Sequence, residues 1–232
     1  MGIRDFQRRH DALREIARGN HEVMASPDSL HVQLIALRQD VEKLRSEPQT
    51  GQRILMKRDT LLPKWRPYVD RYLAAGEVHQ NPIFSYCTVW LFDVGDLGEA
   101  LRWIDIAIEQ QQATPENIKR DFAHFAADAV LEWAEREAAV GHAIEPYFSQ
   151  TFERVRSRWR LNEALTAKWY KFAGLFLLRD NKGEPRATAV ADVQTLRQAD
   201  ALLAEAERLH RHAQVKTHRQ RIAARLRALT EA

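Results

Sequence analysis

Apolar residues along most of this chain recur at intervals of three and four, which is the period of an α-helix with one buried face. Glycine and proline are scarce, nine and eight among 232 residues, and they fall between the periodic segments. No stretch has the strict alternation of a β-strand. The pattern therefore predicts an all-α protein, a multi-helix bundle of antiparallel helix pairs with an N-terminal helical arm and a basic C-terminal helix.

One apolar seam is especially regular and follows Ser26-Pro27-Asp28. Its residues are spaced as the a and d positions of a coiled coil, with charged residues beside them: Leu30, Leu34, Leu37, Val41 and Leu44. Such a seam can pack against a second copy of the chain or against the chain's own domain. We predict residues 1–50 to be an N-terminal helical arm and a candidate oligomerisation segment.

Glycine, proline and capping residues predict where the other helices begin and end. Gly76 ends one helix and Asn81-Pro82 begins the next, while Asp96-Leu97-Gly98-Glu99 has the spacing of a capping box. Pro63 and Thr114-Pro115 are predicted as two further helix starts, and Pro48 and Gly51 as a break in the chain.

The segment Asp180-Asn181-Lys182-Gly183-Glu184-Pro185 is the clearest linker. It separates a predicted central helical core at 51–180 from a predicted C-terminal helical hairpin at 181–232, whose last helix is basic.

The formal net charge is only +3, but the cations are concentrated near the C-terminus. Seven basic residues and no acidic residue lie between Arg208 and Thr230: Arg208, Arg211, Lys216, Arg219, Arg221, Arg225 and Arg227. A single helix with only positive charge, here Arg208 to Arg227, would attract a polyanion such as double-stranded DNA, with salt-dependent and largely sequence-independent contacts to phosphates. An acidic patch on a neighbouring protein is the alternative partner.

Other basic residues are candidates for secondary contacts with DNA. They form one set near the N-terminus, one at the start of the central core and one in its last third: Arg8, Arg9, Lys57, Arg58, Arg154, Arg156, Arg158 and Arg160.

Several classes of chemistry lack the residues that they need. The single cysteine, Cys87, excludes an intramolecular disulfide framework and a cysteine-based zinc finger, and there is no Walker-type phosphate loop and no His-x-x-x-His pair. The acids Asp93, Asp96, Asp121 and Asp128 are the best candidates for a metal-dependent nuclease, but capping and ordinary surface placement explain all four. We therefore assign no catalytic residue, no metal site and no cofactor.

The most apolar stretches, 83–92 and 169–178, are shorter than the roughly 20 residues that span a bilayer. We therefore expect no association with a membrane. The single cysteine fits a reducing intracellular compartment, where we expect the protein to act.

Three short motifs carry a resemblance to a known family. They follow one another in this order: Leu61-Leu62-Pro63-Lys64-Trp65-Arg66-Pro67-Tyr68-Val69, Trp90-Leu91-Phe92-Asp93-Val94-Gly95-Asp96 and Ala100-Leu101. With these motifs the chain resembles the small terminase subunit of contractile-tailed temperate phages that package from cohesive ends. This is the gpM type, often labelled the terminase endonuclease subunit. The resemblance covers about residues 53–227 and includes Lys57-Arg58 and the segment 168–175 around Gly174.

The resemblance implies a DNA-packaging protein of the host cell cytoplasm that recognises the packaging site of the viral genome. It further implies a homo-oligomer, expected to be a ring, that delivers DNA to the large ATPase-nuclease subunit. We expect a recognition and regulatory subunit without catalysis of its own. A metal-dependent DNA endonuclease subunit and a helical-repeat adaptor that binds only protein remain the alternatives.

Overall fold

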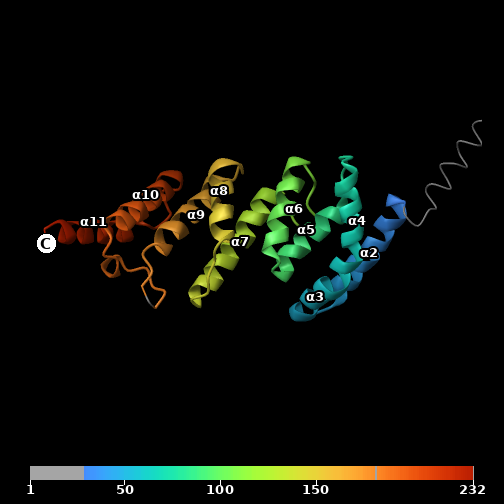
Figure 1. Ribbon diagram of the computed structural model, residues 1–232, viewed down its shortest axis with the longest axis horizontal. Helices are drawn as coiled ribbons and strands as arrows, with labels where there is room; N and C mark the ends of the chain where they lie inside the picture. The colour runs from blue at the N-terminus through green and yellow to red at the C-terminus, as the bar shows by residue number, and fades with distance from the viewer. Residues whose placement is uncertain (1–28, 181, 232) are drawn as a thin grey trace, which may run out of the picture. The chain divides into compact units, whose positions relative to one another are not determined.

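The computed structural model describes residues 29–180 and 182–231 (Figure 1). Apart from one isolated bridge between Arg179 and Pro185, every regular element in that part of the chain is helical. The predicted all-α class is therefore confirmed. The chain divides into two compact units, an N-terminal unit that extends to Gly95 and a C-terminal unit that begins at Asp96. The predicted contacts at Arg8 and Arg9 lie outside the described residues.

The N-terminal unit consists of helices that pack on a nearly fully buried central helix. Its elements are α2 (Leu30–Ser46), α3 (Thr50–Met56), a π-helical turn η1 (Lys57–Leu61), α4 (Leu62–Ala75) and α5 (Pro82–Val94). Helix α5 buries residues on almost every side, as its uniformly apolar sequence predicts. Trp65 and Val69 of α4 and Phe84 of α5 are completely or almost completely buried.

Helices α3 and α4 follow each other without a break. The predicted break at Pro48 and Gly51 lies at 47–49, so it is right for Pro48 and wrong for Gly51, and Pro63 stands in the first turn of α4, as predicted. Gly51 lies inside α3, Pro63 is the second residue of α4, and the π-helical turn joins the two helices. A proline ring clashes with the carbonyl group four residues earlier in a regular helix, which here belongs to Asp59. The wider turn lies at that carbonyl, and it lets the helix continue past Pro63.

The C-terminal unit contains all the remaining helices. They are α6 (Leu97–Glu109), α7 (Phe122–Ala139), α8 (Tyr147–Ser157), α9 (Glu163–Phe176), a short 3-10 turn η2 (Ala187–Ala189), α10 (Val193–Leu209) and α11 (Lys216–Thr230). Aromatic rings of α8 and α9 stack in the core of this unit, with Phe152 and Trp169 inclined by only 7°.

Helices α9 and α10 are antiparallel and unusually close. Glu163 at the start of α9 interacts electrostatically with Arg208 at the end of α10. Further along α9, a Cβ atom at Gly174 would lie 2.9 Å from the Leu203 side chain and 3.1 Å from the Ala199 carbonyl oxygen. Only glycine permits this approach, which accounts physically for the glycine in the 168–175 motif.

Side-chain caps at the helix starts agree with most of the predicted boundaries. Asn81 accepts a hydrogen bond from the Phe84 amide and Asp96 from the Glu99 amide, and a cap of this kind contributes about 1 kcal/mol. The predicted start at Thr114-Pro115 is wrong. The Thr114 hydroxyl donates to the carbonyl oxygens of Ile118 and Arg120 within a loop, and α7 begins instead after Asp121, whose side chain caps it.

The basic segment 208–227 is not one helix, contrary to the prediction. Helix α10 ends at Leu209, Gln214 adopts a positive φ of 58°, and α11 begins at Lys216. The cause is burial, because Val215 and Ile222 turn inward onto the α10 residues Leu203 and Ala206. The result is a pair of helices, α10 and α11, that share one apolar core, and the last of them is basic.

No helix within 29–180 or 182–231 is long and apolar enough to cross a membrane.

Candidate nucleic-acid interface

Two of the seven predicted DNA-binding residues are neutralised by neighbouring carboxylates. Arg208 is paired with Glu205 at 2.6 Å within α10. Arg219 of α11 reaches back to α10 and binds Asp200 at 2.9 Å and Glu207 at 2.8 Å. These pairs raise the pKa of both guanidinium groups. The expectation of seven unneutralised cations is therefore wrong for these two, and Arg219 serves to hold the hairpin together.

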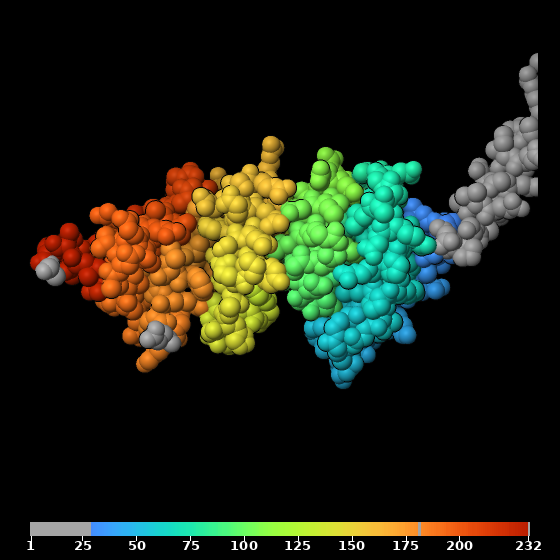
Figure 2. All heavy atoms as spheres, viewed as in Figure 1, coloured from blue at the N-terminus to red at the C-terminus, as the bar shows by residue number. Residues whose placement is uncertain are grey.

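The other five predicted residues have no carboxylate partner within the described part of the chain: Arg211, Lys216, Arg221, Arg225 and Arg227. Arg225 donates to the Val190 carbonyl oxygen at 3.1 Å and Arg227 to the Ala223 carbonyl oxygen at 3.4 Å. Arg221 and Lys216 are exposed. Figure 2 shows the red atoms of α11 at the molecular surface.

The cations of α11 project to two different flanks of the helix. Buried Ile222 marks the inner side, and each residue advances the helix by about 100°. Arg225 therefore lies about 40° from Arg221, whereas Lys216 lies about 140° from it and Arg227 about 120°. The cations of α11 therefore form two groups, Arg221 with Arg225 and Lys216 with Arg227.

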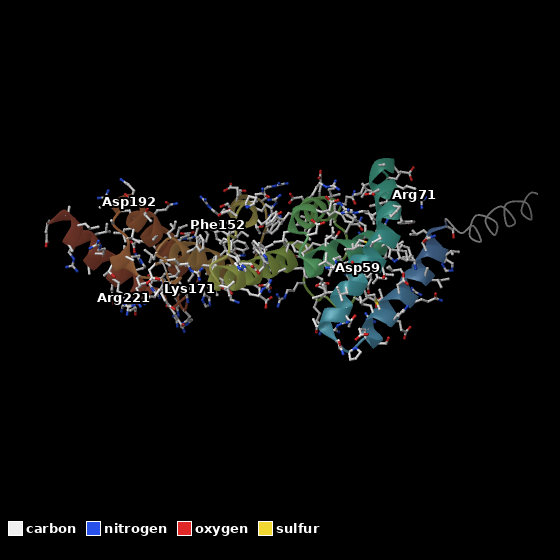
Figure 3. The ribbon with its side chains drawn as sticks, turned by 60° about the horizontal axis from the view of Figure 1, so that its bottom comes forward. Asp59, Arg71, Phe152, Lys171, Asp192 and Arg221 are labelled. Atoms are coloured by element: carbon white, nitrogen blue, oxygen red, sulfur yellow. The ribbon has the colours of Figure 1, made fainter. Side chains whose placement is uncertain are left out.

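One cation that acts electrostatically on α11 was not predicted from the sequence. Lys171 of α9 and Arg221 of α11 both interact electrostatically with His218. Burial, then these two positive charges, lower the pKa of His218 from its ordinary value. Figure 3 shows the labelled Lys171 and Arg221 along the same side of the C-terminal unit. Lys171 was missed because its sequence neighbours are mainly apolar, so that no run of basic residues marks it.

The predicted secondary contacts between Arg154 and Arg160 are mostly engaged in ion pairs. Arg154 makes a two-pronged contact with Asp105, at 2.8 Å for the closest pair, with both side chains less than a quarter exposed. Arg158 approaches the same carboxylate at 3.8 Å. Arg156 lies over the Phe152 ring and 3.8 Å from Glu153. Arg160 is exposed beside a pocket of about 450 Å³.

The two predicted secondary contacts that the structure describes in the N-terminal unit are also paired. Lys57 binds Asp93 at 2.7 Å and Arg58 binds its neighbour Asp59 at 2.8 Å. The first pair accounts for Asp93, one of the acids considered for a nuclease site.

The α2 seam is only partly available for a second copy. Leu37, Val41 and Leu44 are buried within the N-terminal unit, while Leu30 and Leu34 are half-buried. Ile35 is 44% exposed. Oligomerisation through this helix remains a prediction, and the surface that it could offer is the N-terminal half of the seam.

The acids considered for metal chemistry have structural partners. Asp96 and Asp121 cap helices, and Asp128 is paired with Arg120. Within the described ranges there is no group of three or more histidine, cysteine, aspartate or glutamate side chains placed to hold a metal ion. Cys87 is buried, and this burial raises the pKa of its thiol far above the ordinary value, so the thiol is not a nucleophile in the folded protein.

Comparison with known proteins shows that this sequence is similar to phage proteins. The family model described as phage small terminase subunit matches residues 34–164. A probable terminase endonuclease subunit of Haemophilus phage HP1 (strain HP1c1) is 39% identical over 237 residues, which cover 100% of this chain and 84% of that protein. The terminase endonuclease subunit of Escherichia phage P2 is 29% identical over 163 residues, or 69% of this chain and 65% of that protein.

No solved structure matches the chain. The family match spans more than half of the sequence and one similar protein aligns along all of it, in agreement with the resemblance carried by the Leu61–Val69 and Trp90–Asp96 motifs. The chain belongs to the phage small terminase subunit family.

Proposed function

We propose that this protein binds double-stranded DNA at the packaging site of a phage genome and recruits and regulates the large terminase subunit. Membership of the family implies a role in DNA packaging. The observation that carries the DNA-binding part is the group of five basic residues between Arg211 and Arg227 that have no carboxylate partner in the described chain.

The physical argument is the release of counterions from DNA. Each phosphate that a basic side chain neutralises adds about 0.9 to the slope of log affinity against log salt concentration. Exposed cations without carboxylate partners can make such contacts without first breaking an internal ion pair. Arg208 and Arg219 would have to give up such pairs, so we exclude them from the proposed contact.

We further propose that the protein acts as a homo-oligomer, arranged as a ring, in the host cell cytoplasm. The half-buried Leu30 and Leu34 and the exposed Ile35 of α2 support a contact between copies. Folding of the N-terminal unit already uses the rest of the seam, so this contact is confined to the first turns of α2.

The test is binding of the purified full chain to duplex DNA across a salt series, with Mg²⁺ present and absent. The informative variant replaces Lys216, Arg221 and Arg227 together by glutamine, because all three are exposed and lack carboxylate partners. A matched control replaces the exposed residues Lys119, Arg136 and Lys182 by glutamine. We expect loss of affinity and of salt slope in the first variant and neither in the control.

The same assay decides between the alternatives. The printed names of both similar phage proteins favour an endonuclease subunit as the second candidate function. Cleavage of the DNA by the isolated chain with Mg²⁺ present, and none with Mg²⁺ absent, would establish that candidate. Absence of any salt-sensitive binding would favour an adaptor that contacts only protein, and would refute our proposal.

A further inference from the structure

We propose that a groove between α7 and α9 binds the large terminase subunit, through an amphipathic helix of that protein whose two edges carry opposite charges. The proposal deepens the proposed function and rests on its recruitment part, because it names the surface on which the large subunit would dock. The groove lies within the C-terminal unit and has a volume of about 540 Å³, which is in the range of protein clefts that hold ligands.

Each of the two helices contributes one continuous face to the groove. The lining residues of α7 are Asp128, Leu131, Glu132 and Glu135. The lining residues of α9 have the same spacing and are Lys168, Lys171, Phe172 and Leu175. Residues at these intervals lie on one side of an α-helix and extend over about two turns. A groove with two helical walls is a form of site that receives a further helix.

The floor of the groove is apolar and is held in place by the core. Leu131 is 3% exposed. The Phe172 ring stands edge-on to the Phe148 ring, with 5.2 Å between their centroids, and Leu175 packs against the apolar cluster of α10 and α11. Phe172 and Leu175 are only half-buried, so part of the floor is open to solvent. Because the core already orders these side chains, a partner that covers them loses little free energy in ordering them.

The two walls of the groove carry opposite charges, since α7 contributes acids and α9 contributes lysines. Asp128 is paired with Arg120. The other charged residues of the walls form no ion pair within 29–180 and 182–231: Glu132, Glu135, Lys168 and Lys171. The apolar floor keeps the acids and the lysines apart, so each wall retains charge that a partner can pair.

This arrangement of charges disfavours DNA as the occupant of the groove. A phosphate backbone placed against Lys168 and Lys171 would also approach Glu132 and Glu135 on the opposite wall, which repel it. An amphipathic helix meets every requirement of the groove. It can place apolar residues on the floor, basic residues against the α7 wall and acidic residues against the α9 wall.

The described helices of a second copy of this chain do not offer such a helix. Among the described helices of more than seven residues, α2 is the one that exposes a large apolar side chain, Ile35. Arg38 and Lys43 lie about 60° and 80° to either side of Ile35, so both edges of this helix are basic. One edge would be repelled by Lys168 and Lys171. The large subunit is the other protein partner in the proposed function.

The experiment measures binding of the full chain to the purified large terminase subunit of the same phage by isothermal titration calorimetry. Glu132→Lys reverses one charge on the α7 wall, and Lys168→Glu reverses one charge on the α9 wall. The matched controls Glu109→Lys and Arg197→Glu make the same changes at exposed positions of α6 and α10 that do not line the groove. Thermal unfolding checks that each variant keeps the fold, and sedimentation velocity records its oligomeric state.

We expect each wall variant to bind the large subunit about tenfold more weakly, because the reversal replaces an attraction at the edge of the interface by a repulsion. The controls should bind like the unaltered chain. The loss in both wall variants is the distinctive result. A partner of a single charge sign would be weakened by one reversal and strengthened by the other.

Opposite responses of the two wall variants would overturn the proposal, as would affinities equal to those of the controls. A changed oligomeric state with unchanged affinity for the large subunit would place a second copy in the groove and would overturn it too. In each of these outcomes the unaltered chain still binds the large subunit, so the proposed function would stand. If the unaltered chain does not bind the large subunit, the recruitment part of the proposed function fails, and the groove assignment fails with it.

Discussion

Gly174 offers a sharp test of how the C-terminal unit is held together. Replacing a glycine in the middle of an exposed helix by alanine ordinarily stabilises a protein by about 1 kcal/mol, because alanine loses less backbone entropy. At Gly174 the added Cβ atom would meet the Cγ and Cδ2 atoms of Leu203 at 2.9 Å and the Ala199 carbonyl oxygen at 3.1 Å. The side chain can turn away from the new methyl group, but the carbonyl belongs to the α10 backbone and can move only with the helix.

The expected sign follows from comparing the two effects. Overpacking of this kind costs about 1–3 kcal/mol, which exceeds the gain of about 1 kcal/mol in helix propensity. We therefore expect Gly174→Ala to destabilise the protein by about 1 kcal/mol, or to lower the thermal midpoint by roughly 2–4 °C in a chain of this length. Gly98→Ala is the matched control, since its Cβ atom would make only ordinary contacts of 3.5 and 3.8 Å with Tyr147.

Urea unfolding followed by circular dichroism measures both variants, and a double-mutant cycle identifies the contact. Leu203→Ala alone should cost about 2–5 kcal/mol. In that background, Gly174→Ala should cost less than it does alone, because the contacting side chain is gone. Stabilisation by Gly174→Ala comparable with that of Gly98→Ala would refute the close approach of α9 and α10.

Three further predictions concern titratable groups whose neighbouring residues the structure shows. Arg154→Ala should destabilise the C-terminal unit by about 1–3 kcal/mol in urea unfolding, because Asp105 would be left partly buried without its partner. The control Arg156→Ala should change the stability by less than about 0.5 kcal/mol, and equal effects of the two substitutions would contradict the prediction. The pKa of His218 is lowered in the folded chain, so the unfolded chain binds more protons once the pH falls below the ordinary value of 6.5. The contribution of His218 to stability should therefore be complete above that pH and be lost as the pH falls through the folded-state pKa, and the loss should be smaller in His218→Gln. Cys87 should react with a thiol reagent only as fast as the protein unfolds, since burial raises its pKa; rapid reaction of the native protein would show that the helix is not buried.

Helix positions could be predicted from sequence wherever the signals were local. Asn81 and Asp96 stand directly before apolar periodic segments, and each caps its helix through its own side chain. Thr114 carried the same local signal, but its hydroxyl is used inside a loop, and Asp121 provides the cap seven residues later. The pattern alone could not separate the two because both residues are good caps, and only the packing of the loop decides between them.

The electrostatics of the candidate interface depended on contacts that are distant in sequence. Within residues 208–230 no acid is present, so every cation looked unpaired, but Asp200 and Glu207 of the preceding helix take up Arg219. Lys171 of α9 shows the opposite case, a cation from another helix that acts electrostatically on His218 of α11. Composition along the chain identified the region, and only the folding of α9, α10 and α11 onto each other determined which charges remain.

The π-helical turn between α3 and α4 has a consequence for chain length within this family. Such a turn holds one residue more than an α-helical turn, and it lets the consecutive residues Leu61 and Leu62 both face inward. A relative that lacks a proline at position 63 can omit one residue here, close the turn to regular helix and keep Trp65 and Val69 in register with the core. Single-residue gaps placed at 57–61 in an alignment would therefore record the tightening of one helical turn, with no loop gained or lost.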